Sequence, residues 1–198
     1  MRSTEKILNV PALTQRDNAL YASSTCNTTS LAMVAQYYQI RSLDAKQLED
    51  IFTEISLEKW AQDQAVREEG SAYRLRAREV WSVLVNIIRK FTAKITSAAV
   101  TALTIDEICD QIDADRPVII GGNFPCGSST IGHFHVIIGY TDNGNTFIVN
   151  DPWGDPNTAY ASTDGKGVKI SRANAETWWR NAGNGKKLTI MVYGKQHA

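Results

Sequence analysis

Three things are scarce in this sequence of 198 residues: net charge, long apolar runs and cysteine. Lys plus Arg total 21, as do Asp plus Glu, so the formal net charge is zero. A balanced charge offers no electrostatic surface for nucleic acid or an anionic membrane, and we expect neither partner. No segment reaches the roughly 18 apolar residues of a membrane-spanning helix, and the apolar run Ile7–Val10 is too short for a signal peptide. We therefore expect that the protein is made in the cytoplasm and does not insert into a membrane.

The cysteines are Cys26, Cys109 and Cys126. Their number is odd, and their spacings match neither a disulfide framework nor a zinc motif. At least one thiol is therefore unpaired within the chain, and a reducing compartment suits all of them. Cys109 falls on the apolar stripe of a helical pattern and is expected in the core.

Apolar periodicity organises the rest of the chain. Segment 27–40 carries an apolar stripe at helical spacing and predicts an amphipathic helix that begins near Cys26. Similar patterns predict helices at 43–55, 78–91 and 104–113. Short β-branched and aromatic runs predict strands at 117–124, 135–140, 146–151, 167–171 and 188–193, with a further helix at 173–181. This order indicates a single α+β domain over residues 1–198, with a helical part (about 26–115) packed on an antiparallel sheet part (about 117–194).

Cys26 has one feature that a cysteine nucleophile requires. A cysteine attacks as the thiolate, which the free N–H groups and the dipole of a helix N-terminus stabilise. Thr25, Asn27 and Thr28 are candidate N-cap residues, so Cys26 is expected at the start of its helix. The adjacent imidazole and the group that orients it must come from elsewhere in the chain.

The segment GHFHVIIGY, residues 132–140, supplies two candidate histidines after a Gly/Ser-rich loop. The next predicted strand ends at Asp151, so a hairpin of the two strands would make His133 and Asp151 neighbours at one sheet edge. His133 and His135 share a strand face, but His135 lies about 6–7 Å farther along the strand. We therefore predict His133 as the base beside Cys26, and His135 as a packing or supporting residue.

Other interpretations of these residues stay open. His-x-His is a metal-ligand spacing that Asp151 or Cys126 could complete, but no HExxH or CxxC motif accompanies it, and we expect no metal. Cys126 is a rival nucleophile in a loop, although no helical pattern follows it. Trp153 is expected to cover the His–Asp pair. Of two further tryptophans, Trp178 and Trp179, one is expected to pack and the other to be exposed.

Three segments, STCNTTSLAMVAQYY, GHFHVIIGY and VNDPWG, occur in this order and resemble the papain superfamily. They resemble more closely its branch of bacteriocin-processing peptidases, including soluble bacterial and phage-encoded forms, and LNVPALTQRDN is similar to the opening segment of that branch. The resemblance implies that Cys26 is the nucleophile, His133 the base and Asp151 the residue that orients the imidazole. Gln15 and the Cys26 backbone N–H take the place of the oxyanion donors. Gln15 lies farther from Cys26 than in the best-known members, and Asn27 stands where the family often has glycine.

The resemblance implies a cysteine peptidase or amidohydrolase that works without a cofactor. Relatives in this branch cut leader peptides after paired glycines or cut peptide cross-bridges of bacterial cell walls. The absence of a transporter segment favours a peptidoglycan peptide as substrate, with release of the protein to the wall as a phage lysin. The alternative is a catalytically silent binding module or a host-directed phage effector on the same fold. The complete Cys, His and Asp set favours the enzyme.

Overall fold

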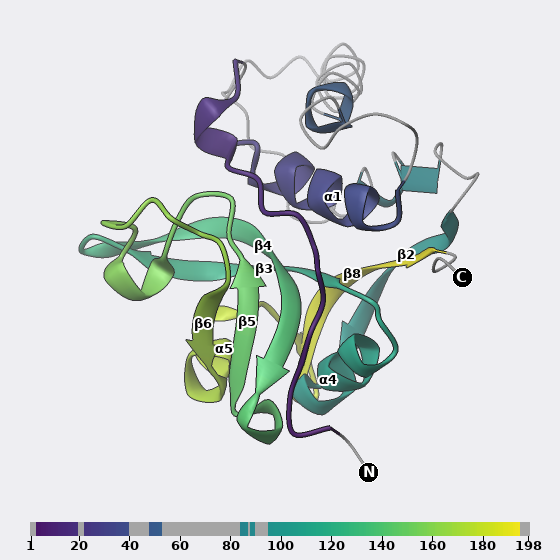
Figure 1. The fold of residues 1–198 in the computed structure, drawn as a ribbon. Coiled ribbons are helices and arrows are strands. Elements are labelled where there is room, and N and C mark those ends of the chain that lie inside the picture. Colours follow the sequence, from purple (N-terminus) through teal and green to yellow (C-terminus); the bar gives the residue numbers. More distant parts are fainter. Residues whose placement is uncertain are drawn as a thin grey trace.

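The computed structural model describes residues 3–19, 22–39, 48–52, 84–86, 88–89 and 95–194. The strands are β1 (Lys6–Ile7), β2 (Ile95–Leu103), β3 (Val118–Cys126), β4 (Ser129–Thr141), β5 (Thr146–Asn150), β6 (Val168–Ser171), β7 (Asn181–Gly183) and β8 (Lys186–Gly194). The α-helices are α1 (Cys26–Tyr37), α4 (Ile105–Asp113) and α5 (Arg172–Trp178), and the 3-10 turns are η1 (Gln15–Asp17), η2 (Asp142–Gly144) and η3 (Pro156–Thr158). The strands form one antiparallel sheet of order β2-β8-β3-β4-β5-β6, with β1 on β4 and β7 on β8 (Figure 1).

The predicted α+β class is confirmed, and the predicted strands correspond to β3, β4, β5, β6 and β8. Helix α4 begins as its pattern suggests, because Thr104 and Glu107 form a reciprocal capping box. The predicted helical part (about 26–115) contains a strand that the patterns do not predict, since residues 95–103 form β2 and pair with β8. The segment ITSAAVTAL has no clear period, and its strand state is stabilised by a partner about 90 residues away.

The predicted helices at 43–55 and 78–91 lie largely outside the described residues. Residues 48–52, 84–86 and 88–89, which the structure describes, are helical. Among them, Leu48, Phe52, Leu84 and Ile88 are buried in the core. No helix in the described part of the chain is long and apolar enough to cross a membrane.

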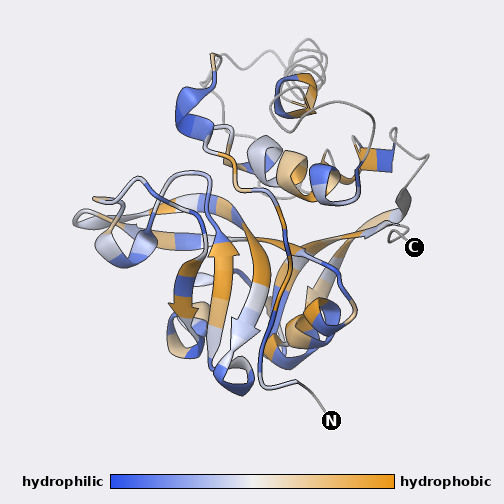
Figure 2. Ribbon diagram, in the orientation of Figure 1, coloured by the Kyte–Doolittle hydropathy of each residue, from blue (hydrophilic) through white to orange (hydrophobic). Residues whose placement is uncertain are grey.

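Helix α1 crosses the sheet and packs against β4 and β3 (Figure 1). Its predicted apolar stripe is buried, but so is the opposite side of the helix, which carries Thr29 and Met33. The prediction of an amphipathic helix is therefore wrong, and α1 is an enclosed central helix. Figure 2 shows the corresponding concentration of apolar residues along β4 and β5.

Strands β3 and β4 form a long hairpin that is in register from Val118–Ile137 to Cys126–Ser129. The residues predicted as a Gly/Ser-rich loop extend this hairpin, and only Gly127 and Ser128 form its turn. His133 therefore lies inside β4 and not at its start. Strand β5 is shorter than β4 and ends at Asn150, which pairs with Val136. The chain therefore leaves the sheet three residues before it would reach the level of His133.

The N-terminal segment runs across the sheet to the helical side of the molecule (Figure 1). Strand β1 pairs with Gly139 and Tyr140 of β4, beyond Ile137, which pairs with the first residue of β3. The backbone N–H of Leu8 then donates to Ile138, and the Asn150 side-chain amide donates to the carbonyl of Val10. These bonds carry the segment to η1, next to the loop that follows β5.

Candidate active site

The first turn of α1 presents Cys26 with N–H groups that the helix itself does not use. Helix α1 begins at Cys26, and Thr25 is its N-cap residue. The Thr25 side chain makes no capping bond to the helix, and its Oγ1 accepts a hydrogen bond from Asn18 at 2.8 Å. The N–H of Thr28 donates to Asn27 Oδ1 at 2.9 Å, but the N–H of Cys26, at the first helical position, has no intrahelical acceptor. An anion at Cys26 is therefore favoured by the helix terminus.

His133 and Asp151 form a buried pair. The distance between His133 Nε2 and Asp151 Oδ1 is 2.7 Å, and both side chains are almost inaccessible to solvent. The sheet topology explains the contact. Strand β4 continues past the end of β5, and Asp151, the first residue after β5, reaches the His133 ring. With Nε2 on Asp151, the ring atom left for Cys26 is Nδ1.

Charge dominates the protonation of this pair. Burial alone would lower the pKa of His133, but the negative charges of Asp151 and Cys26 and hydrogen bonds to both outweigh burial and raise this pKa to about 10. Burial alone would raise the pKa of Asp151, but the His133 charge and hydrogen bonds from His133 and His135 hold it well below its usual range. The pair is therefore an imidazolium and a carboxylate at neutral pH.

Further groups surround the Asp151 carboxylate. The N–H groups of Trp153 and Gly154 donate to Oδ1 at 2.8 and 3.3 Å, because the chain turns tightly after Pro152. The Tyr160 hydroxyl donates to Oδ2 at 3.3 Å, and the ring of Tyr160 meets the His133 ring edge-on. Burial and the Asp151 charge raise the pKa of Tyr160, so its hydroxyl stays a donor. No sequence motif marked Tyr160, which reaches the site through a left-handed turn at φ 65°.

Glycine is required where a second loop crosses Asp151. The N–H of Asp151 donates to the carbonyl of Gly165 at 2.8 Å. A Cβ atom on Gly165 would lie 1.8 Å from the Asp151 carbonyl oxygen. The backbone around Asp151 is thus fixed by a contact that only glycine allows.

His135 also reaches Asp151, from the other side of the carboxylate. Its Nδ1 lies 3.5 Å from Asp151 Oδ2, and its Nε2 accepts a hydrogen bond from the Trp179 indole at 3.0 Å. Burial lowers the pKa of His135 and outweighs the effect of Asp151. Trp179 is buried, but Trp178, expected to be exposed if its neighbour packs, is half-buried against Phe124.

Gln15 is held close to Asp151 by backbone contacts of η1. The N–H of Gln15 donates to the Pro152 carbonyl at 2.9 Å, and Arg16 Nε donates to the Trp153 carbonyl at 2.6 Å. The Arg16 guanidinium also lies 3.8 Å from the centre of the Trp153 ring. The Gln15 amide is buried and donates one N–H to the Ala22 carbonyl at 2.7 Å, which leaves its second N–H for another acceptor.

A buried polar cluster joins η1 to the start of α1. Asn18 Nδ2 donates to Thr25 Oγ1 and, at 2.7 Å, to the carboxylate of Glu49. Thr29 of α1 donates to the same carboxylate oxygen. Glu49 is fully buried, and nothing in its local pattern distinguished it from a surface helix residue.

The other two cysteines have different surroundings, although Cys126 interacts electrostatically with Tyr160. Cys109 is buried in α4 and packs in the core, as expected. Cys126 ends β3 at the tip of the hairpin, four pairs beyond the Gly122–His133 pair. No group of three metal-binding side chains occurs among the described residues. His135 Nε2 faces an N–H and His133 Nε2 faces Asp151, so neither atom is presented to a metal ion.

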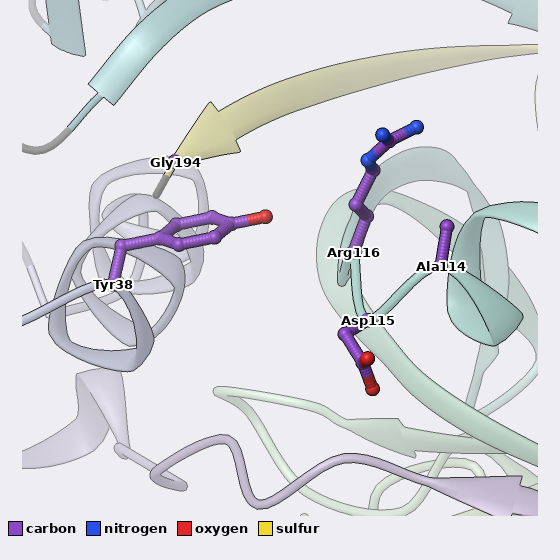
Figure 3. Close-up of a pocket in the computed structure, with 5 residues that line it drawn as sticks. All are labelled: Tyr38, Ala114, Asp115, Arg116 and Gly194. Atoms are coloured by element: carbon purple, nitrogen blue, oxygen red, sulfur yellow. The ribbon is translucent and has the colours of Figure 1, made fainter. Parts of the chain in front are cut away.

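A pocket of about 180 Å³ lies at the opposite end of α1, between Tyr38, Gly194 and the turn after α4 (Figure 3). Tyr38 follows the last residue of α1, roughly 18 Å from Cys26 at 1.5 Å per residue. The side chains of Asp115 and Arg116 leave the turn in opposite directions. Asp115 pairs with Lys6 at 2.7 Å, and Arg116 lies over the Tyr193 ring. This pocket is separate from the Cys26 site.

An α+β fold with a cysteine at the start of a buried helix and a histidine on the facing antiparallel sheet is that of the papain-like cysteine peptidases. The sequence profile of the Peptidase_C39 like family matches residues 7–187, and the chain belongs to this family. The fold is similar to that of xylellain, a cysteine protease from Xylella fastidiosa, over 99% of this chain and 88% of that chain, with a TM-score of 0.57 and 13% sequence identity. No curated protein matches the sequence. The expected papain-like fold and cysteine peptidase class are confirmed.

Proposed function

We propose that the protein hydrolyses a peptide bond through a triad of Cys26, His133 and Asp151, with Gln15 as an oxyanion donor. One observation carries the proposal: the buried 2.7 Å pair of His133 and Asp151, whose imidazole also feels the charge and hydrogen bond of Cys26. A buried imidazolium beside a thiol favours the thiolate, which is the nucleophilic form.

The reaction begins when the Cys26 thiolate attacks the carbonyl carbon of the scissile bond. The backbone N–H of Cys26 and the second N–H of Gln15 Nε2 stabilise the negative charge that develops on the carbonyl oxygen. His133 gives its Nδ1 proton to the leaving amine, and the acyl group remains on Cys26 as a thioester. His133 then accepts a proton from a water molecule, whose oxygen attacks the thioester and releases the acid and the Cys26 thiolate. Asp151 accepts the Nε2–H bond throughout.

The substrate that we propose is a peptide cross-bridge of the bacterial cell wall. The support is the resemblance of the three sequence segments to a branch whose members cut such bridges or cut leader peptides after paired glycines. A wall substrate requires release of the protein from the cytoplasm, where we expect it to be made, as for a phage lysin.

Two measurements test the proposal. The first is alkylation with iodoacetamide at pH 6, followed by peptide mass spectrometry that reports the rate at each cysteine. We expect Cys26 to react at least ten times faster than Cys126, and His133→Ala to remove the difference. Equal rates at Cys26 and Cys126, or a fast Cys126, would contradict the triad and favour a silent binding module.

The second measurement identifies the substrate. Purified peptidoglycan and a peptide carrying a double-glycine leader site are incubated separately with the wild-type protein and with Cys26→Ala. New amino termini from peptidoglycan alone would support the wall substrate, whereas cleavage of the leader peptide alone would refute it. No product from either, with a fast Cys26, would also refute the proposed substrate while leaving the triad intact.

A further inference from the structure

His135 is a fully buried histidine that the proposed reaction does not use. It lies two residues after His133 on the same face of β4, and the Phe124 ring packs edge-on against it. Each of its ring nitrogens faces one polar group: Nε2 faces the Trp179 indole at 3.0 Å, and Nδ1 faces Asp151 Oδ2 at 3.5 Å. His135 thus lies between the Trp179 indole N–H and the carboxylate of Asp151, the candidate triad residue.

Trp179 determines where the proton of His135 lies. An indole N–H can only donate, so Nε2 of His135 must be the unprotonated acceptor. A neutral imidazole that lacks a proton on Nε2 carries it on Nδ1. A second proton on Nε2 would set two N–H groups against each other at 3.0 Å, so the ring is held neutral.

The Nδ1–H group that results points to Asp151. Within the described part of the chain, Nδ1 of His135 is a buried atom without a hydrogen bond, and Asp151 Oδ2 lies 3.5 Å from it. A buried N–H without a partner is costly, and the Oδ2 atom is the acceptor at hand. The contact is long at 3.5 Å, and so is the Tyr160 hydroxyl contact with the same atom at 3.3 Å.

The two oxygens of Asp151 are therefore held differently. Oδ1 accepts the shorter bonds, including those from His133 at 2.7 Å and Trp153 at 2.8 Å. The Cβ–Cγ torsion of an aspartate has a broad profile, so the carboxylate plane is set by its contacts. Rotation about this bond moves both oxygens, so a donor on Oδ2 opposes the rotation together with the bonds to Oδ1.

We propose that His135 is a positioning residue: Trp179 holds it as the Nδ1–H tautomer, and that N–H fixes Oδ2 of Asp151 while Oδ1 serves His133. This proposal rests on the triad put forward above. The ionisable groups that face His135 are Asp151 and His133, while Trp179 and Phe124 cover it with neutral rings. Because His135 is a neutral donor, it can hold the Asp151 carboxylate without competing with His133 for the ion pair.

The tautomer is tested directly by NMR of protein with 15N-labelled histidine between pH 5 and 9. We expect His135 to show a protonated Nδ1 and an unprotonated Nε2 throughout, without titration. In Trp179→Phe the fixed acceptor role of Nε2 is lost, and we expect the tautomers to mix or the ring to titrate. Trp178→Phe, its neighbour in the chain, is the control and should behave as wild type. A protonated Nε2 in the wild type would overturn the proposal.

Kinetics separate positioning from packing. His135→Leu removes the N–H, and we expect kcat to fall roughly ten-fold with KM unchanged, the effect of one hydrogen bond to a charged group. His135→Asn keeps an N–H close to the position of Nδ1 and should restore most of kcat. Equal losses in both variants, or none in either, would overturn the proposal. Iodoacetamide labelling of Cys26 at pH 6 replaces kcat where hydrolysis is too slow to follow.

The two proposals fail in different ways. A wild-type protein with a slow Cys26 refutes the triad, and His135 then has no reaction to support, although its tautomer can still be read by NMR. A fast Cys26 with a mixed or inverted His135 tautomer refutes only the positioning role. Circular dichroism and thermal unfolding check that each variant is folded. If His135→Leu does not fold, the NMR measurement on the wild-type protein still tests the tautomer.

Discussion

Replacing Asp151 with Asn tests which charge holds the proton on His133. The substitution removes the negative charge and leaves the shape of the side chain almost unchanged. The asparagine oxygen can still accept from His133 Nε2, and from the N–H groups of Trp153 and Gly154, at the present 2.7, 2.8 and 3.3 Å. We therefore expect the imidazole to keep its contact with residue 151 and to lose its electrostatic partner, while the new amide nitrogen faces His135 and Tyr160 in place of Oδ2.

The structure sets the size of the effect. The pKa of His133 is raised to about 10 against burial, which alone would lower it. The distance from the ordinary value of about 6.5 corresponds to about 5 kcal/mol of preference for the imidazolium, at about 1.4 kcal/mol per pH unit. Asp151 and Cys26 share this preference, and loss of one adjacent charge typically lowers a histidine pKa by roughly 1 to 3 pH units. The imidazolium of wild type should persist to about pH 10, and that of Asp151→Asn should be lost at a pH lower by this amount.

NMR titration of the His133 ring from pH 5 to 11 measures the change directly. Where hydrolysis is measurable, the basic limb of the kcat/KM profile should move in the same direction, because the leaving amine needs a proton from the imidazolium. Asp155→Asn is the matched control, since Asp155 caps η3 and has no contact with the His133 ring. An unchanged His133 titration in Asp151→Asn would refute the reasoning, because the proton would then be held by some group other than Asp151.

Three shorter predictions accompany this one. Gly165→Ala would place Cβ 1.8 Å from the Asp151 carbonyl oxygen, so urea unfolding should show a loss of about 1–3 kcal/mol and peptidase activity should fall, while Gly132→Ala, with open space around its Cβ, should change little. Because the pKa of Asp151 is lowered in the folded protein, its contribution to stability is complete above about pH 4 and is lost as the pH falls through the folded-state pKa. The difference in unfolding free energy between wild type and Asp151→Asn should therefore shrink from pH 6 to pH 2. A constant difference would contradict this. Elemental analysis should find no stoichiometric zinc, and chelators should leave hydrolysis unchanged; about one metal ion per chain would show that the histidines have been misassigned.

The structural outcome separates two kinds of information in the sequence. Short-range patterns predicted α4, α5 and five of the strands, because caps and apolar periodicity act within a few residues. The same patterns misjudged β2, since a run of Ala and Thr is compatible with either state until β8 pairs with it. They also misjudged the burial of α1, because a local stripe shows which side is apolar and does not show how many sides are covered.

The candidate site divides in the same way. Cys26 at a helix start, and a histidine strand followed by a strand that ends in aspartate, were visible as ordered motifs, and the structure places His133 against Asp151. Glu49, Tyr160 and the link between Trp179 and His135 carried no local signal. Each joins segments that are 9 to 44 residues apart in the chain.

By itself, the sequence determined which side chains are available for the chemistry and placed Cys26 at a helix start and His133 and Asp151 close to two neighbouring strands. Only the tertiary structure decided their distances and protonation. Strand β4 extends past the end of β5, so Asp151, the next residue, can contact His133. Both residues are buried. The physical reason is that a pKa depends on burial and on charges a few ångströms away, and these are properties of packing between distant segments. His135 illustrates this most clearly, because its tautomer is determined by a tryptophan that follows it by 44 residues.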